Sequence, residues 1–171
     1  MKVNIRKYPT HRFYHNWLYN WLGYSPKQRT SVHIDRWDTW SMDDTLAPII
    51  LPMLVQLKET KHGAPIVDDE DVPKQLHMTK KEKAAFNKDG STDDKFFRRW
   101  DWIMDEMIWA FEQKNRDHWQ NDYYGPYIEG EDGKVLSGRF EWIDDKGRDA
   151  HQKRMSNGFK LFGKYYEALW D

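Results

Sequence analysis

An acidic and aromatic run over residues 35–46, Asp-Arg-Trp-Asp-Thr-Trp-Ser-Met-Asp-Asp-Thr-Leu, carries the side chains best suited to binding chemistry. A base or sugar ring could stack on Trp37 or Trp40 while Arg36 binds a phosphate, because stacking contributes about 1–3 kcal/mol per base. The run ends in helix-start residues such as Asp43, which suits the positive end of a helix dipole. The alternative is that both rings belong to the core and the acids only cap a helix.

A second set of candidate residues is mostly basic and lies further along the chain. His151 and Arg154 are one turn apart on the predicted last helix and Lys160 follows, and such groups suit phosphate oxygens. His62 precedes Gly63 at a predicted helix end. Together with the aromatic run, these residues form the predicted ligand-binding set. The alternatives are a solvated helix face for the first three residues and a helix cap for His62.

Acidic side chains on one side of another predicted helix offer the alternative of catalysis. Asp101, Asp105 and Glu112 fall at i, i+4 and i+11, and such carboxylates could hold Mg²⁺ against a pyrophosphate. A hydrolase of this type also needs a second acidic helix with Glu-x-x-Glu spacing, which the sequence lacks. A solvated face is the favoured interpretation, and no catalytic residue is predicted.

Other common sites have no signature in the sequence. There is no cysteine, the seven histidines form no His-Glu-x-x-His pair, and phosphate-loop and nucleophile-elbow motifs are missing. We therefore predict no metal site and no cofactor, and the interpretation leans away from an enzyme.

The composition argues against two classes of binding partner, DNA and membranes. The 171 residues carry 27 basic and 28 acidic side chains, a net charge of -1, which argues against generic DNA binding. No run approaches the roughly 20 apolar residues of a membrane span, and the first residues lack the apolar stretch of a signal peptide. We expect a soluble cytoplasmic protein without membrane contact. The unusual feature of the composition is its ten tryptophans, and the sequence does not show which of them lie in the core and which on the surface. The protein could also form a homo-oligomer.

Periodicity predicts the elements that must position these residues. Strands are predicted near residues 2–7 and 31–37, and helices near residues 10–23, 41–63, 92–111 and 148–170. Asp132 and Gly133 indicate a hairpin turn. The predicted fold class is α+β, a mostly helical single domain over residues 1–171. It has three long helices, a short N-terminal helix, two short N-terminal strands, a late β-hairpin and a long irregular excursion at about residues 64–90.

Two glycines interrupt the predicted last helix. Gly158 and Gly163 each weaken a helix by up to about 1 kcal/mol relative to alanine. A glycine in such a position indicates either a weakened helix or a neighbour that packs close to the backbone.

Four blocks of sequence carry a resemblance to known proteins. They are residues 37–57, which begin Trp-Asp-Thr-Trp-Ser-Met-Asp, then residues 62–73, residues 105–112, and residues 157–166, Asn-Gly-Phe-Lys-Leu-Phe-Gly-Lys-Tyr-Tyr. Their amino-acid sequences resemble those of a family of small uncharacterised accessory proteins of tailed bacteriophages, and the resemblance covers most of residues 33–171. The resemblance implies a viral protein in the cytoplasm of an infected host cell, where such proteins often act on host defence or nucleotide pools. Residues 1–32 lie outside it.

The predicted function is that of a non-catalytic phage accessory protein. It would sequester a nucleotide-like small molecule, either a host-defence signal or a metabolite, and so serve counter-defence. Two alternatives stay open. One is a metal-dependent nucleotide hydrolase or pyrophosphatase that uses Asp101, Asp105 and Glu112. The other is an inhibitor that binds a host protein through an aromatic surface, because tryptophan, tyrosine and arginine are common in binding hot spots.

Overall fold

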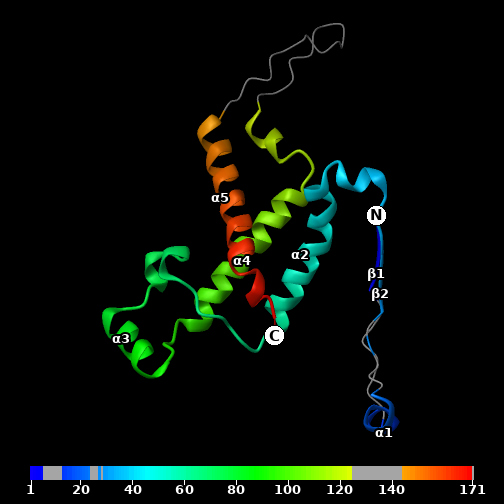
Figure 1. The fold of residues 1–171 in the computed structure, drawn as a ribbon. Helices are drawn as coiled ribbons and strands as arrows, with labels where there is room; N and C mark the ends of the chain where they lie inside the picture. Colours follow the sequence, from blue (N-terminus) through cyan, green and yellow to red (C-terminus); the bar gives the residue numbers. More distant parts are fainter. Residues whose placement is uncertain (6–12, 24–26, 28, 125–143, 171) are drawn as a thin grey trace, which may run out of the picture. The chain divides into compact units, whose positions relative to one another are not determined.

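The computed structural model of the protein describes residues 1–5, 13–23, 27, 29–124 and 144–170 (Figure 1). The chain divides into two compact units, Met1–Thr45 and Leu46–Asp171, and each is described by itself. The single domain predicted from the sequence stays a prediction. No helix of the described ranges is long and apolar enough to cross a membrane.

The fold class predicted from the sequence is wrong, because the described chain is mostly helical with one small sheet. Strands β1 (Lys2–Ile5) and β2 (Thr30–His33) pair antiparallel, with Lys2 opposite His33. Each strand has four residues, and β2 is exposed along its whole length. A ribbon of this size provides no buried sheet face, so it does not form the layer that an α+β fold requires. The predicted late hairpin lies outside the described residues.

The N-terminal unit also contains two short helical elements. Helix α1 (Phe13–Leu22) ends at Gly23, whose φ of 64° is a left-handed conformation that suits a residue without a side chain. The 3-10 helix η1 (Arg36–Thr39) begins at Asp35, and a capping box joins Asp35 and Asp38 through the backbone N–H groups of each other. The predicted strand therefore stops before Asp35, where the chain turns into η1.

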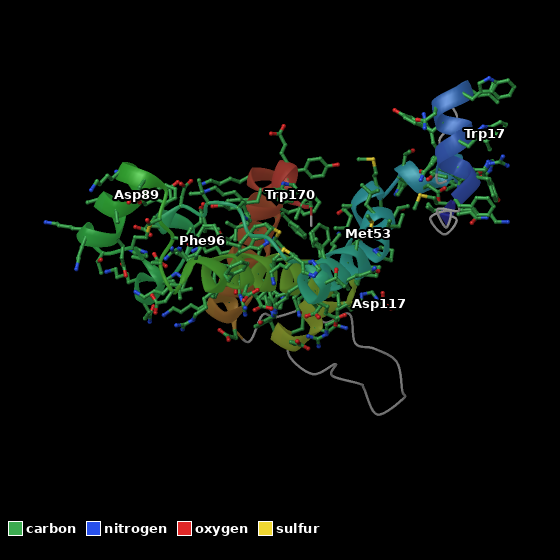
Figure 2. All side chains as sticks on the ribbon, turned by 90° about the horizontal axis from the view of Figure 1, so that it is seen from below. Trp17, Met53, Asp89, Phe96, Asp117 and Trp170 are labelled. Carbon is green, nitrogen blue, oxygen red and sulfur yellow. The ribbon has the colours of Figure 1, made fainter. Side chains whose placement is uncertain are left out.

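Three long helices supply most of the C-terminal unit, as the sequence predicts. Helix α2 (Met42–Thr60) begins in the N-terminal unit and runs through Pro48 and Pro52. Helices α4 (Phe96–Asn115) and α5 (Asp145–Lys164) pack along each other (Figure 1). In Figure 2, Phe96 marks the start of α4 and Trp170 the end of the described chain.

The core of this unit is centred on α4, whose apolar side chains recur at helical spacing. Trp100, Ile103, Met104 and Met107 are completely or almost completely buried, and Ala47 and Leu54 of α2 join them in the same cluster. On the α5 side, Leu161 and Tyr165 complete the cluster, and the ring of Tyr165 meets that of Trp100 edge to face at 5.7 Å.

Residues 64–90 contain more regular structure than the predicted irregular excursion. They form the 3-10 helices η2 (Asp69–Asp71) and η3 (Lys74–Leu76) and the helix α3 (Lys80–Asp89). Helix α3 begins with a Thr79 to Glu82 capping box and is followed by Gly90 in the left-handed region. Two further 3-10 helices, η4 (Trp119–Tyr123) and η5 (Tyr166–Ala168), follow α4 and α5.

A buried arginine of α4 attaches the excursion to this helix. Arg99 donates to Asp93 at 2.7 Å and to the carbonyl of Leu76 at 2.9 Å, and both charged side chains are shielded from solvent. The adjacent hollow, lined in part by Ile66 and Phe86, has a volume of about 10 Å³. Such a volume holds one water molecule at most, so this hollow is too small for a nucleotide.

Candidate functional site

The predicted stacking residues lie together at η1. The side chains of Trp37 and Trp40 are 66% and 83% exposed, so the rings face solvent instead of the core. Their ring centres are 6.2 Å apart with planes at 50°, and the guanidinium of Arg36 lies 5.3 Å from the centre of the Trp37 ring. A cation and two accessible indoles are thus carried by five consecutive residues.

The acids around this site hold the backbone in place. The Asp35 side chain accepts from the Trp37 N–H, and the Asp38 carboxylate accepts from the Asp35 N–H at 2.7 Å. Asp38 also pairs with the amino group of Met1 at 2.5 Å, and this ammonium is the main reason why the pKa of Asp38 lies below its usual value. The ionised capping box fixes the turn on which the rings stand, and Asp43 follows in the first turn of α2.

The predicted basic set on α5 does not form an anion surface. Arg154 makes a bidentate ion pair with Glu106 of α4, at 2.7 and 3.0 Å, and its guanidinium lies 4.0 Å from the centre of the Trp109 ring. Lys160 is exposed, and His62 is exposed just beyond the end of α2. These residues belong to the C-terminal unit, whereas Arg36, Trp37, Trp40 and Asp43 belong to the N-terminal unit. Within the N-terminal unit, Arg36, Trp37 and Trp40 lie together at η1. Within the C-terminal unit, His151 and Arg154 share contacts with the Trp109 ring.

His151 lies inside a group of aromatic rings that the sequence analysis missed. Its ring is parallel to that of Trp119 at 4.4 Å and is 4.9 Å from that of Trp109, while Nδ1 is 3.0 Å from the hydroxyl of Tyr123. Nε2 is buried and has no hydrogen-bond partner among the residues that the structure describes. Burial is the main cause that lowers the pKa of His151; Arg116 and Arg154 lower it further, and Asp122 opposes them. A neutral, packed imidazole is a poor ligand for an anion.

The acids proposed for catalysis are mostly engaged in ion pairs. Asp101 pairs with Lys61 at 2.5 Å and Asp105 pairs with Lys58, both lysines belonging to or following α2. Glu112 is exposed on α4. An ammonium beside each of the first two carboxylates leaves little negative charge to attract Mg²⁺, so this arrangement resembles a solvated, ion-paired face.

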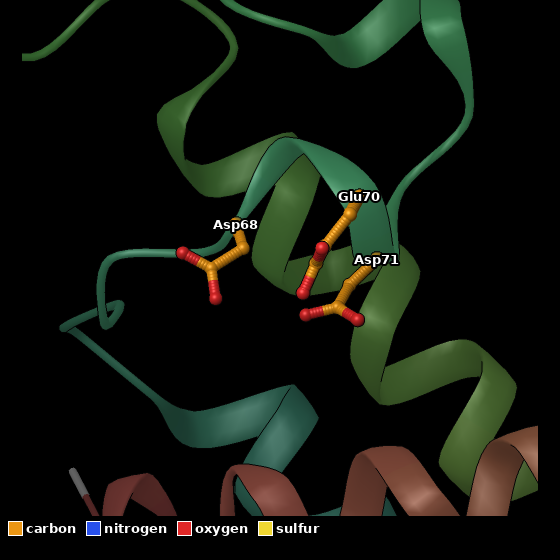
Figure 3. Close-up of side chains that lie close together, drawn as sticks. All are labelled: Asp68, Glu70 and Asp71. Carbon is orange, nitrogen blue, oxygen red and sulfur yellow. The ribbon is translucent and has the colours of Figure 1, made fainter.

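A different acidic group lies where η2 meets α5. The carboxylates of Asp68, Glu70 and Asp71 are close enough to share one cation (Figure 3). The Nζ of Lys164 lies 2.8, 3.3 and 2.5 Å from them, and these hydrogen bonds, first to Asp68 and then to Asp71, raise the pKa of Lys164. The lysine occupies the position that a metal ion would need.

Tyr165 extends the same network into the core. Its hydroxyl donates to Asp71 at 2.8 Å and accepts from the Asp68 N–H at 3.2 Å. Burial and the Asp71 carboxylate raise the pKa of Tyr165 to about 12. The network therefore holds η2 against α5. No sequence signal could have found it, since the partners are more than 90 residues apart.

Compared with protein-family models, with curated proteins and with solved structures, the chain shows no match. The resemblance to tailed-phage accessory proteins therefore stays a prediction. The geometry of η1 and the chemistry of its side chains remain as indications of function.

Proposed function

We propose that the protein binds a nucleotide-like small molecule on Arg36, Trp37 and Trp40 without changing it chemically. The observation that carries the proposal is the pair of highly exposed indoles beside a guanidinium on one capped turn. A base stacks on the free face of Trp40 or Trp37, and Arg36 binds a phosphate oxygen. The capping box limits the movement of the turn, so less entropy is lost when a ligand binds.

The ion pairs of the acidic residues support a function without catalysis. Asp101 and Asp105 are each paired with a lysine, and the ammonium of Lys164 lies among the three carboxylates at η2. The hydrolase alternative would need at least one of these groups to release its lysine before it could hold a metal ion. In the setting that the phage resemblance implies, a binder of this kind would act by sequestering a host-defence signal or a metabolite.

The expected affinity follows from the few contacts available at η1. One stacked base contributes about 1–3 kcal/mol, and a charged hydrogen bond contributes about 1.5–3 kcal/mol. These terms sum to about 2.5–6 kcal/mol, which corresponds to dissociation constants of roughly ten millimolar to tens of micromolar. Binding must therefore be measured at high ligand concentration.

Calorimetric titration of the full chain with AMP and with ATP tests the proposal. We expect both to bind, Trp40→Ala to weaken binding at least about fivefold, and the ligand to be recovered intact. Trp170→Ala is the matched control, because Trp170 is also an exposed indole but belongs to the other unit. The proposal is wrong if neither nucleotide binds, if both variants lose affinity equally, or if the ligand is hydrolysed.

A further inference from the structure

The N-terminal part of the chain is positively charged, although the net charge of the whole protein is close to zero. Residues 1–34 contain six of the 27 basic side chains and none of the 28 acidic ones. The remaining 137 residues therefore carry 21 basic and 28 acidic side chains. A segment of this kind attracts polyanions even though the whole protein is close to neutral. The prediction that the protein does not bind DNA generically depends on its net charge and takes no account of this uneven distribution.

Helix α1 adds a second group of exposed rings to the same unit. Phe13, Trp17 and Trp21 follow each other at intervals of four residues and so lie on one face of the helix. The rings of Trp17 and Trp21 stack at 5.3 Å with an interplanar angle of 24°, and the two side chains are 61% and 70% exposed (Figure 2 labels Trp17). Only His15 is buried within α1, so this aromatic face is not part of a core.

Exposed cations accompany the rings. Lys2, Lys27 and Arg29 are exposed in the described part of this unit, and Arg36 lies beside Trp37. The first acids of the chain, Asp35 and Asp38, are used in the capping box of η1. The unit therefore presents exposed rings and cations, alongside the exposed carboxylates of Asp43 and Asp44 at the start of α2.

This inference rests on the proposed function and extends it from a single nucleotide to a polymer. We infer that the ligand of the N-terminal unit is a single-stranded nucleic acid whose bases stack on the rings of η1 and α1 and whose phosphates contact the basic side chains. A mononucleotide uses only the few contacts at η1. A strand uses both ring groups, and the stacking contributions add along the chain.

The chemistry favours a single strand over other anionic partners. In a duplex, the base faces are covered by their neighbours, so the indoles could contact only base edges and phosphates. An acidic protein would match the cations, but protein interfaces combine charges of both signs at the rim with aliphatic and aromatic anchors at the centre. The exposed face of α1 is formed mainly by aromatic rings, which stack on any base.

Fluorescence anisotropy with the full chain tests the inference. The probes are labelled oligo(dT) and oligo(U) of about 16 nucleotides, near the upper end of single-strand site sizes. The comparison ligands are a duplex of equal length, TMP and UMP, and two polyanions without bases, poly-L-glutamate and anionic lipid vesicles. We expect at least one oligonucleotide to bind roughly tenfold or more tightly than its mononucleotide, the duplex and both polyanions. The stronger of the two identifies DNA or RNA.

Variants of α1 separate stacking from charge. Trp17→Ala should weaken oligonucleotide binding about tenfold and leave mononucleotide binding unchanged, whereas Trp17→Phe should retain most of the affinity. Arg29→Gln should reduce the slope of log K against log salt by about 0.7. Trp170→Ala is again the control, and circular dichroism checks that each variant is folded.

Each outcome decides between the two proposals. If mononucleotides bind and oligonucleotides bind no more tightly, the inference is overturned and the proposed function stands. If poly-L-glutamate or vesicles bind as tightly as the strand, the unit recognises an acidic protein or a membrane surface, and the inference is overturned. If only oligonucleotides bind, the inference stands and the small-molecule function does not. If no nucleotide or oligonucleotide binds, both are wrong.

Discussion

Gly158 of α5 lies so close to Ala110 of α4 that a Cβ at position 158 would be 2.4 Å from the Ala110 Cβ. It would also be 2.5 Å from the carbonyl oxygen of Glu106. The glycine inside this helix is therefore explained by the close approach of two backbones. We expect Gly158→Ala to lower the free energy of unfolding by about 1–3 kcal/mol, because the helices must separate. Urea denaturation measures the change.

Gly163 of the same helix provides the matched control. A Cβ at this position would meet nothing within 4 Å in the described part of the chain, and the residue does not have a positive φ. Gly163→Ala should raise the free energy of unfolding by up to about 1 kcal/mol, because alanine loses less backbone entropy in a helix. If Gly158→Ala raises the free energy of unfolding as Gly163→Ala does, the close packing of α4 and α5 at Gly158 is wrong.

Lys164 should stabilise the contact between η2 and α5 through Asp71. Asp68 and Glu70 are largely exposed, so their ion pairs contribute little, whereas the Asp71 carboxylate is almost completely buried. Lys164→Met should lower the free energy of unfolding by about 1–3 kcal/mol at neutral pH, because a buried charge loses its partner. Lys160→Met, an exposed site on the same helix, should change it by less than about 0.5 kcal/mol. An equal loss of stability in Lys164→Met and Lys160→Met would contradict the role of Lys164 as the partner of the buried Asp71 carboxylate.

His151 should make the fold less stable in acid. Its folded pKa lies below the ordinary value of about 6.5, so the unfolded chain binds its proton first as the pH falls. The stability that the neutral ring provides is present above pH 6.5 and decreases as the pH falls from there to the folded pKa. His151→Phe keeps a ring against Trp119 but does not titrate. The difference in free energy of unfolding between wild type and His151→Phe should decrease as the pH is lowered from about 8 to about 5.

Two measurements check this account of His151. Chemical denaturation across the pH range gives the stability difference, and an NMR titration of the imidazole gives the folded pKa directly. A difference that stays constant with pH, or an imidazole pKa above its ordinary value, would contradict the account.

The helices of the C-terminal unit could be predicted from the sequence because they bury one face each. Trp100, Ile103, Met104 and Met107 recur at helical spacing and are buried on α4. The fold class could not be predicted, because alternation identifies β1 and β2 but does not give the extent of the sheet. Alternation over residues 31–37 extends the predicted strand into the first 3-10 helix, although Asp35 and Asp38 have the spacing of its capping box.

The candidate site could be predicted only where its members are neighbours in sequence. Arg36, Trp37 and Trp40 lie together because one turn carries them. Arg154 instead forms an ion pair with Glu106, and His151 stacks on Trp119. Those partners come from other elements, so the sequence gives no sign of them. Exposure was equally unpredictable, since the same residue type is buried at Trp100 and open to solvent at Trp40.

The central claim, that the indoles of η1 bind a nucleotide, is tested most directly by NMR. The ten tryptophans of the ¹⁵N-labelled full chain each give an indole N–H resonance, which Trp→Phe variants assign. On titration with AMP to saturation, the Trp37 and Trp40 resonances should shift while those of the buried Trp100 and Trp119 stay in place. If the Trp37 and Trp40 resonances do not move, or if only the indoles beside His151 and Arg154 respond, the claim is wrong.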